Sequence, residues 1–519
     1  MPQRKLARNI SVMSSAIFMS RVMGLIRDQV MAFFFGTTFL NDAFLVGFKI
    51  PNLLRSLFGE GALSASFVPI YNELGIKEGR QKQVHFALQV LSILTFFLLI
   101  LTIVGIALAP LIVSVLYPGL KPQTHDLAVI LTRIMFPYLF WIGLSSTMIA
   151  ILNSHDYFFM TGLSSALLNV GMIGSVVLPR LLWKLESEEL VRWAAWGVFG
   201  GGFLQTLINL PYLRKLGYSL RLVLRFSGET LVTMWKRFLP SVIGVGIREI
   251  NLIADSLMAS FLVVGSISAL EFGNRLFQLP LGIFAISVGT TLLPAYSRLV
   301  TNSDFPELSR HLRFASVSLM YIMLPVTTII FALGGDFVRI LFERGAFDAR
   351  ASLMTEQALF YYSLGLIFFS LNQTLTPLFY ANKDTRTPVK IAAAMMLINI
   401  VLNLVLMQFI QHRGLALATS LTALLNYLVL LRLIRKKLPQ ISLKGIFPNA
   451  LKSLVICSLM WVILFYVNSL VSLQNKWQLL GKDILLVLFC LVFFYLAGIL
   501  LKLDYLREAT RFLWKKRLT

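Results

Sequence analysis

Long apolar runs recur from one end of this 519-residue chain to the other. Each is about 18 residues or longer, which is enough for a helix to cross a hydrocarbon layer roughly 30 Å thick. Only 14% of the residues are charged, whereas soluble domains carry about 25%. The sequence therefore predicts an all-α polytopic membrane protein. It excludes a cytosolic enzyme, a disulfide scaffold, a disordered chain and an outer-membrane barrel.

Dividing the chain at its polar connections predicts fourteen transmembrane helices. Their approximate limits are 9–35, 39–60, 86–116, 127–152, 157–181, 193–213, 237–263, 268–297, 312–341, 353–380, 387–409, 413–435, 448–472 and 481–501. The basic N-terminus precedes an apolar stretch that has no small-residue cleavage site, so we expect a retained first helix and not a signal peptide. Cys457 and Cys490 both lie inside apolar runs and are interpreted as small core residues.

The net charge of +23 has two explanations, nucleic-acid binding or basic cytoplasmic loops. In a chain of membrane helices the second is preferred, because Lys and Arg are retained on the cytoplasmic side. With the N-terminus inside, 29 of the 47 Lys and Arg residues fall in or beside the cytoplasmic connections and tails, and about ten fall on the other side. The distribution predicts that both termini are cytoplasmic and that nucleic acid is not a partner.

An internal repeat is visible in the first twelve spans. Asp28–Phe34 resembles Asp255–Phe261, a separation of 227 residues, and other similar segments lie 225 to 229 residues apart. Each repeat holds six spans, so both have the same orientation and should be related by a pseudo-two-fold axis along the membrane normal, as in transporters. We therefore predict an N-terminal six-helix lobe (1–225), a C-terminal six-helix lobe (226–440), and two extra helices with a basic cytoplasmic tail (441–519).

Charged residues interrupt the first two spans of each repeat. An Arg at the bilayer centre costs at least about 2.5–3.5 kcal/mol, so such residues should face a watery cavity or a partner. The four arginines that we expect to line a cationic central cavity are Arg21, Arg27, Arg55 and Arg275. The alternative is that these side chains reach the membrane surface or pair with carboxylates that only fasten helices.

A cavity lined by guanidinium groups fits an anionic, phosphorylated substrate, because guanidinium binds phosphate with two parallel hydrogen bonds. Asp42 and Glu60 would balance the charge of the empty cavity, or each would form a structural pair with an arginine. Asn52 lies among these residues in span two. We count all of them as candidate substrate-binding residues.

Glycine and proline fall where bends would assist gating. Gly24, Gly36, Pro51 and Pro280 lie in or next to the charged spans, although both residue types are tolerated in membrane helices. Residues 58–64 are interpreted as a flexible turn before 66–71, which would be a cytoplasmic gate or simply a loop.

Several motifs resemble the MurJ (MviN) lipid II flippase family of the multidrug/oligosaccharidyl-lipid/polysaccharide exporter superfamily. They are Ser20–Asp28, Asn41–Phe44, Ile50–Arg55, Glu60–Ala62, Phe67–Pro69 and Phe342–Phe347. The resemblance extends over nearly the whole chain. It implies a bacterial inner-membrane protein that flips the undecaprenyl-pyrophosphate-linked peptidoglycan precursor lipid II to the outer leaflet by alternating access. The implied partners are lipid II, membrane lipids and the peptidoglycan synthesis machinery.

The resemblance also implies roles for particular residues. The family's cavity arginines fall on Arg21, Arg27, Arg55 and Arg275, and a cavity acid falls on Asp42. The last two spans would form a groove for the lipid tail, and they were judged almost uncharged apart from Lys452.

Some relatives bind sodium, and the corresponding ligands here would be Asp255, Asn399, Asn403 and Thr419. Oxygen ligands suit a hard cation, but Asn403 stands where relatives have a second acid. Hydrogen bonding between helices is the alternative role for these asparagines. No other cofactor is expected.

Three other functions were weighed. An exporter of another polyprenyl-linked oligosaccharide or of drugs has the same fold, although a drug exporter should present carboxylates and aromatic residues. A membrane glycosyltransferase needs a clustered carboxylate or histidine motif; the five histidines are scattered and interpreted as loop residues. A purely structural scaffold is disfavoured by the buried charge. The sequence therefore predicts a transporter and not an enzyme.

Overall fold

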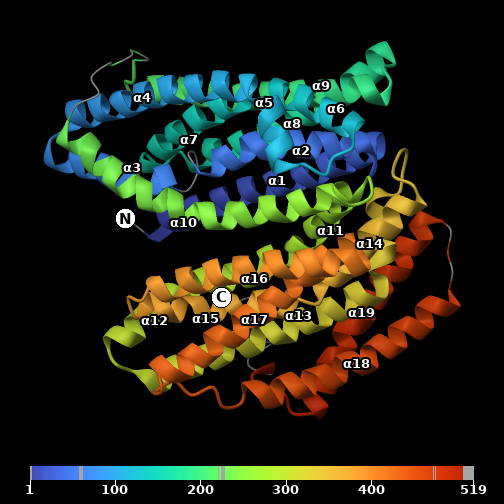
Figure 1. Ribbon diagram of the computed structural model, residues 1–519. Helices are drawn as coiled ribbons and strands as arrows, with labels where there is room; N and C mark the ends of the chain where they lie inside the picture. Colours follow the sequence, from blue (N-terminus) through green and yellow to red (C-terminus); the bar gives the residue numbers. More distant parts are fainter. Residues whose placement is uncertain are drawn as a thin grey trace. The chain divides into compact units, whose positions relative to one another are not determined.

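A computed structural model describes residues 3–57, 62–219, 221, 223, 228–471, 473 and 475–506. These residues form helices and connections, with no strand among them (Figure 1). In chain order the elements are α1 (Gln3–Phe35), α2 (Phe39–Arg55), α3 (Ala62–Lys77), α4 (Arg80–Ala107), α5 (Ala109–Leu116), α6 (Pro122–Met135), α7 (Tyr138–Ser154), α8 (Phe158–Trp183), α9 (Ser187–Lys215), α10 (Glu229–Ser260), α11 (Ser266–Pro280), the π-helical turn η2 (Leu281–Ala285), α12 (Ile286–Thr301), α13 (Phe305–Phe342), α14 (Ala349–Ser363), α15 (Leu366–Ala381), α16 (Arg386–Ile410), α17 (His412–Lys437), α18 (Ile446–Leu470) and α19 (Lys476–Leu500). The all-α prediction is confirmed.

Contacts within the chain divide it into two compact units. Unit 1 comprises residues 1–268 together with 344–347, and unit 2 comprises 269–343 together with 348–519. Helix α10 therefore packs with the first unit, through its contacts with α3. The lobe limits 1–225, 226–440 and 441–519 follow from the sequence repeat, which is a different criterion, and they stay a prediction.

The repeat is also present in the backbone, at a separation of 227 residues. Asp156 and Lys184 have φ of 67° and 55°, and the residues 227 positions later, Lys383 and Gln411, have φ of 60° and 52°. Non-glycine residues rarely adopt positive φ, so two matching pairs are informative. Helices α8 and α16 begin and end at corresponding positions under the same shift. Both halves therefore place their helix ends at equivalent residues.

The second span of each repeat is built from two helices with a π-helical turn between them. In the second repeat η2 follows Pro280 and separates α11 from α12; in the first, residues 56 and 57 are also π-helical. Proline lacks an N–H and crowds the preceding turn, which favours such an irregularity. Residues 62–77 form α3 and correspond to α12. The loop alternative for 66–71 was therefore wrong, and residues 62–64 of the predicted turn 58–64 are helical, whereas 58–61 lie outside the described residues. The role of this segment as a gate stays a prediction.

Nine helical segments in the described part of the chain are long and apolar enough to cross a membrane. The predicted spans that lack a counterpart among these nine are 9–35, 39–60, 193–213, 237–263 and 353–380. Helices α1, α2 and α10 carry intramembrane charges, and α14 and α15 are separate helices divided at Leu364. The count of fourteen spans stays a prediction.

Close helix packing in unit 1 depends on glycine. Helix α8 packs along α9 and against α1. A Cβ on Gly201 of α9 would lie 2.9 Å from the Cα of Leu168 in α8, and a Cβ on Gly171 would lie 2.9 Å from the carbonyl oxygen of Gly197. Small residues let membrane helices approach until their backbones touch, which strengthens dispersion contacts where no hydrophobic effect operates.

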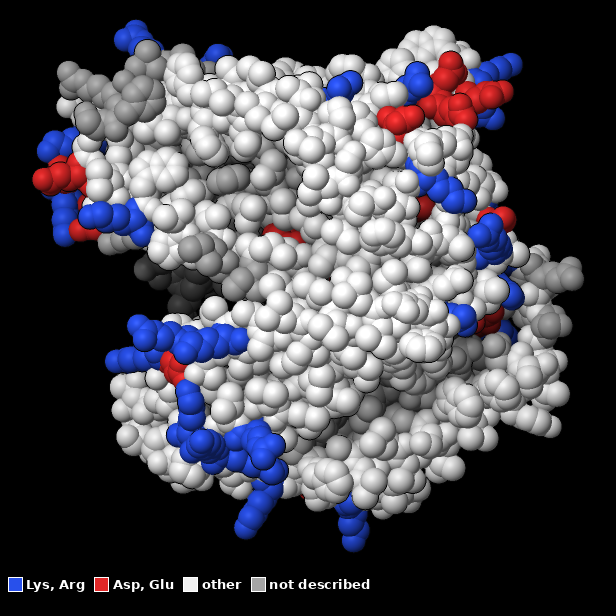
Figure 2. All heavy atoms as spheres, viewed as in Figure 1, with Lys and Arg blue, Asp and Glu red and all other residues white. Residues whose placement is uncertain are grey.

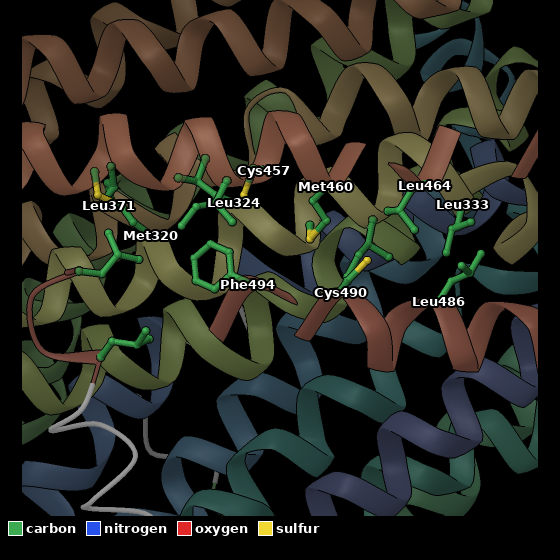
Figure 3. Close-up of a cluster of buried hydrophobic side chains, with 14 of the residues drawn as sticks. Met320, Leu324, Leu333, Leu371, Cys457, Met460, Leu464, Leu486, Cys490 and Phe494 are labelled. Carbon is green, nitrogen blue, oxygen red and sulfur yellow. The ribbon is translucent and has the colours of Figure 1, made fainter. Parts of the chain in front are cut away.

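Helix α13 is the central helix of unit 2. It contacts α12, α14, α15, α18 and α19. Figure 3 shows the apolar cluster that joins α13 to the last two helices, with Leu324, Met460 and Phe494 among its members. Cys457 and Cys490 are buried in this cluster as free thiols, which confirms their interpretation as core residues.

Charged side chains lie mostly at the helix ends. Within each unit, Figure 2 shows most Lys and Arg residues of the visible face near the ends of the helices, with uncharged surface between them. This distribution suits helices whose middle sections contact hydrocarbon.

Adjacent glycines in α9 provide a matched test of the packing. Gly201→Ala should lower stability by up to about 2 kcal/mol, because overpacking costs about 1–3 kcal/mol and alanine's better helix propensity returns about 1 kcal/mol. Gly200 has nothing within 4 Å of its Cβ position, so Gly200→Ala should be neutral or stabilising. Thermal unfolding in detergent measures both; equal effects would contradict this account of the α8–α9 contact.

Candidate functional site

Arg27 is held between two helices of unit 1. Its Nε and Nη2 donate to Asp28 Oδ1 at 3.1 and 2.7 Å, and its Nη1 donates to Asn169 Oδ1 of α8 at 3.0 Å. Its side chain is 14% exposed. Three of the five guanidinium N–H groups are used in this way, which leaves two for a further acceptor. The partners fix the orientation of the group and neutralise part of its charge.

The other candidates of α1 and α2 are less buried. Arg21 is exposed, and Arg55 is half-buried, with Nε donating to Asn52 Oδ1 at 2.9 Å. Asn52 therefore orients an arginine in this structure. Glu60 lies outside the described residues. Arg21, Arg27 and Arg55 belong to unit 1.

Asp42 is buried, with 4% of its surface exposed. Its Oδ2 accepts a hydrogen bond from Gly265 N at 2.6 Å, and its Oδ1 accepts from Ser268 N at 2.9 Å and from Ser268 Oγ at 2.6 Å. These donors stand at the start of α11, where backbone N–H groups have no partner inside the helix. The groups that bind the Asp42 carboxylate are thus at a helix terminus. The structural alternative in the sequence analysis was a pair with an arginine.

Lys49, on the same helix as Asp42, reaches across to α10. Its Nζ donates to Ser256 Oγ at 2.8 Å. Together the two side chains tie α2 to α10 and to the beginning of α11 within unit 1.

Arg275 belongs to unit 2, on α11. Its Nη2 lies 3.7 Å from Glu271 Oε1, one turn earlier, and its side chain is 42% exposed. A pair this long and this accessible contributes little to stability.

Residues 344–347 of the Phe342–Phe347 motif belong to unit 1 and contact the end of α1 there. Ala346 N donates to Phe33 O at 2.8 Å. Gly36 and Gly345 have φ of 54° and 59°, and a Cβ on either would lie within 2.4 Å of a backbone oxygen in the facing segment. Glycine is required at both positions because of this contact and the positive φ.

The sodium candidates divide between the two units. Asp255 is in unit 1, whereas Asn399, Asn403 and Thr419 are in unit 2. In unit 2, Asn403 Nδ2 donates to Asn399 Oδ1 at 3.0 Å. Asn399 Nδ2 donates in turn to Thr422 Oγ1 at 3.4 Å, and Thr419 Oγ1 donates to Leu415 O. The bond from Asn399 to Thr422 joins α16 to α17, as the alternative role of hydrogen bonding between helices predicts, whereas the bond from Asn403 to Asn399 lies within α16. These neutral oxygens alone are a weak ligand set for a cation.

A polar cluster at one end of several unit 1 helices was missed in the sequence analysis. The Tyr71 hydroxyl is hydrogen-bonded to the Tyr218 hydroxyl and, at 2.8 Å, to His155 Nε2. Arg80 lies 2.9 Å from the same histidine nitrogen and donates to Leu216 O at 2.8 Å. The cluster joins α3, α4, the end of α7 and the end of α9.

The interpretation of all five histidines as loop residues was wrong for four of them. His85, His125, His311 and His412 lie within α4, α6, α13 and α17, and only His155 lies between helices. His412 is buried and bonds Met354 O at 3.1 Å.

The last two helices are less apolar than the sequence analysis held. Lys482 and Asp483 both lie inside the predicted span 481–501, and both are buried near Asp336 of α13. Adjacent opposite charges in an apolar run were the signal that could have revealed them.

Comparisons with known proteins agree with one another. A family profile described as "Lipid II flippase MurJ" matches residues 31–482. A Burkholderia cenocepacia protein named "Lipid II flippase MurJ" is 34% identical over 440 residues, 83% of this chain and 84% of the relative. A Buchnera aphidicola subsp. Baizongia pistaciae protein named "Probable lipid II flippase MurJ" is 30% identical over 93% of this chain and 94% of its own.

Solved structures are similar over most of the chain. One titled "Lipid II flippase MurJ, inward closed conformation" has a TM-score of 0.78 and 26% identity, covering 94% of this chain and 98% of that one. An inward-facing multidrug resistance MATE family transporter of the MOP superfamily has a TM-score of 0.66 at 15% identity, covering 84% and 99%. The second likeness concerns the fold alone.

Removing the Asp42 carboxylate should destabilise unit 1. Asp42→Ala leaves two buried N–H groups without an acceptor, at about 1–3 kcal/mol each. Asp42→Asn keeps one acceptor oxygen and should cost less. Thermal unfolding in detergent compares both with Asp126→Asn, a change at an exposed side chain. A stable Asp42→Ala protein would show that the α11 cap is not needed for folding.

His155 should make stability fall in mild acid. Burial and the neighbouring Arg80 hold the pKa of His155 below its usual value of 6.5. Below about pH 6.5 the unfolded chain therefore takes up a proton that the folded protein resists, so stability falls as the pH falls. The difference between the melting temperatures near pH 7.5 and near pH 5.5 should be smaller for His155→Gln than for wild type. The exposed-site control His85→Gln should match wild type; if His155→Gln does so too, the interpretation is wrong.

Proposed function

This chain belongs to the MurJ family, and on that premise we propose that it flips lipid II, the undecaprenyl-pyrophosphate-linked peptidoglycan precursor, from the cytoplasmic to the outer leaflet of the bacterial inner membrane. The observation that carries the proposal is the match of the family profile over residues 31–482. It is supported by relatives named as lipid II flippases that align over 83% and 93% of the chain. The activity is transport, and no catalytic step is proposed.

The pyrophosphate is the part of this substrate that the arginines can recognise. We propose that Arg21, Arg27, Arg55 and Arg275 bind it during transport, since guanidinium groups pair with phosphate oxygens in a fixed fork geometry. The hydrogen bonds from Arg27 to Asn169 and from Arg55 to Asn52 support this role. Each amide orients a guanidinium group without adding negative charge, while the Asp28 carboxylate neutralises part of the charge of Arg27.

The two C-terminal helices suit the lipid tail. Of the residues in the 18-residue apolar segment of each helix, only 28% are buried in α18 and 22% in α19, whereas 67% are buried in α13. Their outward faces expose large apolar side chains such as Leu451, Val462 and Leu488. We propose that the polyprenyl chain lies along these helices and stays in hydrocarbon while the polar head group crosses.

Alternating access is the proposed mechanism. The site opens to the cytoplasm, takes up the head group, closes and then opens to the outer side. Both leaflets hold the same chemical species, so direction requires an external bias. Each positive charge that moves through the field is worth about 2.3 kcal/mol per 100 mV, so the membrane potential is an adequate driver.

Three finer points belong to the same proposal. Both termini are cytoplasmic, as the Lys and Arg distribution predicts. The outer leaflet product is passed to the peptidoglycan synthesis machinery. Sodium, if it is used, would require Asp255 as the charged ligand, because Asn399, Asn403 and Thr419 are neutral. None of the three is needed for the arginine–pyrophosphate contact.

Replacing an arginine should reduce flipping. A charge-assisted hydrogen bond contributes about 1.5–3 kcal/mol, so Arg27→Ala and Arg275→Ala should each slow transport roughly 10- to 100-fold. The measurement is the accessibility of lipid II at the outer face of cells depleted of their native flippase and supplied with this chain.

The matched control is Arg180→Ala, which removes an exposed arginine that bonds only Lys184 O and Leu185 O. Its transport should equal that of wild type. Undiminished flipping by the Arg27 and Arg275 variants would contradict the arginine assignment. Failure of the wild-type chain to expose lipid II, with export of another polyprenyl-linked oligosaccharide instead, would overturn the substrate.

A further inference from the structure

A charged group is buried in unit 2 where α13, α18 and α19 meet. It consists of Asp336 on α13, Asn468 on α18, and Lys482 and Asp483 on α19. The apolar cluster of Figure 3 ends one helical turn away, at Leu333, Leu464 and Leu486. These charges therefore lie inside the packed helices, next to their main apolar contact. Lys482 and Asp483 belong to the hairpin of α18 and α19, which stands outside the six-helix repeat, and Asp336 belongs to α13.

Lys482 is fully engaged with its neighbours. Its Nζ lies 2.8 Å from Asp336 Oδ2 and donates to Asn468 Oδ1. Asn468 Nδ2 donates to Ala332 O at 3.2 Å, which fixes the direction of the amide. The side chains of Lys482 and Asp336 are only 10% and 11% exposed. Lys482 and Asp336 thus form a satisfied, electrically neutral pair.

Asp483 adds a second carboxylate to this neutral pair. Its side chain is 2% exposed, and Lys482 Nζ lies 3.5 Å from its Oδ1, at the limit of a hydrogen bond. Its Oδ2 is buried and has no hydrogen-bond partner. If both acids were ionised, the group would carry one net negative charge. An uncompensated buried carboxylate costs several kcal/mol, and a group in that position is normally neutralised.

A route for protons leads from this group to an open pocket. The pocket has a volume of about 330 Å³ and is lined by Arg339, Glu343, Ser352, Glu356 and Lys476, among others. Glu356 interacts with the charges of both Arg339 and Asp336. Its lining residues Glu343, Ala349, Ser352, Leu473 and Lys476 lie between predicted spans nine and ten or between spans thirteen and fourteen. The positive-inside rule assigns both of these connections to the outer side. Ionisable groups therefore continue from the outer surface to the buried acids.

We propose that Asp483 is a proton-binding site beside the Lys482–Asp336 pair, and that it exchanges its proton with the outer side of the membrane through this pocket. Binding transfers one proton from water to a carboxylate oxygen, and the net charge of the group changes from −1 to zero. No bond to carbon forms or breaks. The site does not depend on which substrate the protein moves.

A proton fits this group better than a metal ion. The ammonium of Lys482 already occupies the position between Asp336 and Asn468 where a cation would bind, and it would repel a second one. Where two carboxylates share a site, like-charge repulsion keeps one of them protonated. Lys482 on α19 lies beside both acids, and Asn468 on α18 accepts from the same ammonium. Glu356 on α14 interacts with the charge of Asp336, and it lines the pocket together with Arg339 and Glu343 of the α13 end and Lys476 of α19.

Infrared spectroscopy of the purified full-length protein tests the proposal directly. The C=O stretching band of a protonated carboxyl group should be present in wild type at neutral pH, disappear as the pH is raised, and be absent from Asp483→Asn. Asp336→Asn should also lack it, because Asp483 then becomes the counter-ion of Lys482 and ionises. The control Asp126→Asn, at a side chain that is 80% exposed, should keep the wild-type band.

Stability provides a second measurement if a band is hard to assign. Wild type should lose thermal stability as the pH rises through the titration of the site, because the folded protein must then hold an unpaired carboxylate. Asp483→Asn should lose less. Identical infrared bands in wild type and Asp483→Asn, together with identical pH–stability curves, would overturn the proposal and leave the group as a fastening ion pair. Neither measurement involves lipid II, so a failure of the proton-site proposal is distinct from a failure of the proposed transport function.

Discussion

Polar groups that enter the hydrocarbon layer must find their partners within the protein, and this requirement underlies the structure. Asp42 is satisfied by backbone N–H groups at the start of α11. Arg27 is held by a carboxylate and an amide, and Lys482 is held in the same way on another set of helices. All of these contacts cross between helices except the one between the neighbours Arg27 and Asp28, so the charges that are costly to insert also specify which helices pack together. Charged groups whose charge such partners do not balance are the places where ligands and protons can bind.

The two repeats share a backbone but differ in charge. Matching positive-φ residues and matching π-helical turns show that the helix ends and irregularities are equivalent. Arginine is less evenly distributed: α1 and α2 supply three candidate arginines and α11 supplies one. A duplicated fold with unequal charge suits an asymmetric substrate, since the scaffold is the same in both halves while the recognition groups differ.

The last two helices add a separate function to this scaffold. Their outward faces are apolar, as a polyprenyl tail requires, and their inward faces contact α13 through the cluster of Figure 3. The buried acids and lysine lie at one end of that contact. Under the proposals made here, one pair of helices serves both the hydrophobic part of the substrate and a proton from the outer side.

The sequence by itself determined the fold class, the repeat and the arginines of α1, α2 and α11, because apolar length, periodic similarity and the cost of intramembrane charge are properties of local sequence. Only the tertiary structure decided the partners. Asp42 caps a helix that begins more than 220 residues later, His155 joins a cluster with Tyr71 and Tyr218, and Asp483 lies beside an acid of α13. The structure also showed that residues 62–77 are helical and that Lys482 and Asp483 are buried. Local sequence could not supply these results, because a side chain's burial and hydrogen bonds depend on segments that are distant along the chain and become neighbours only when the helices pack.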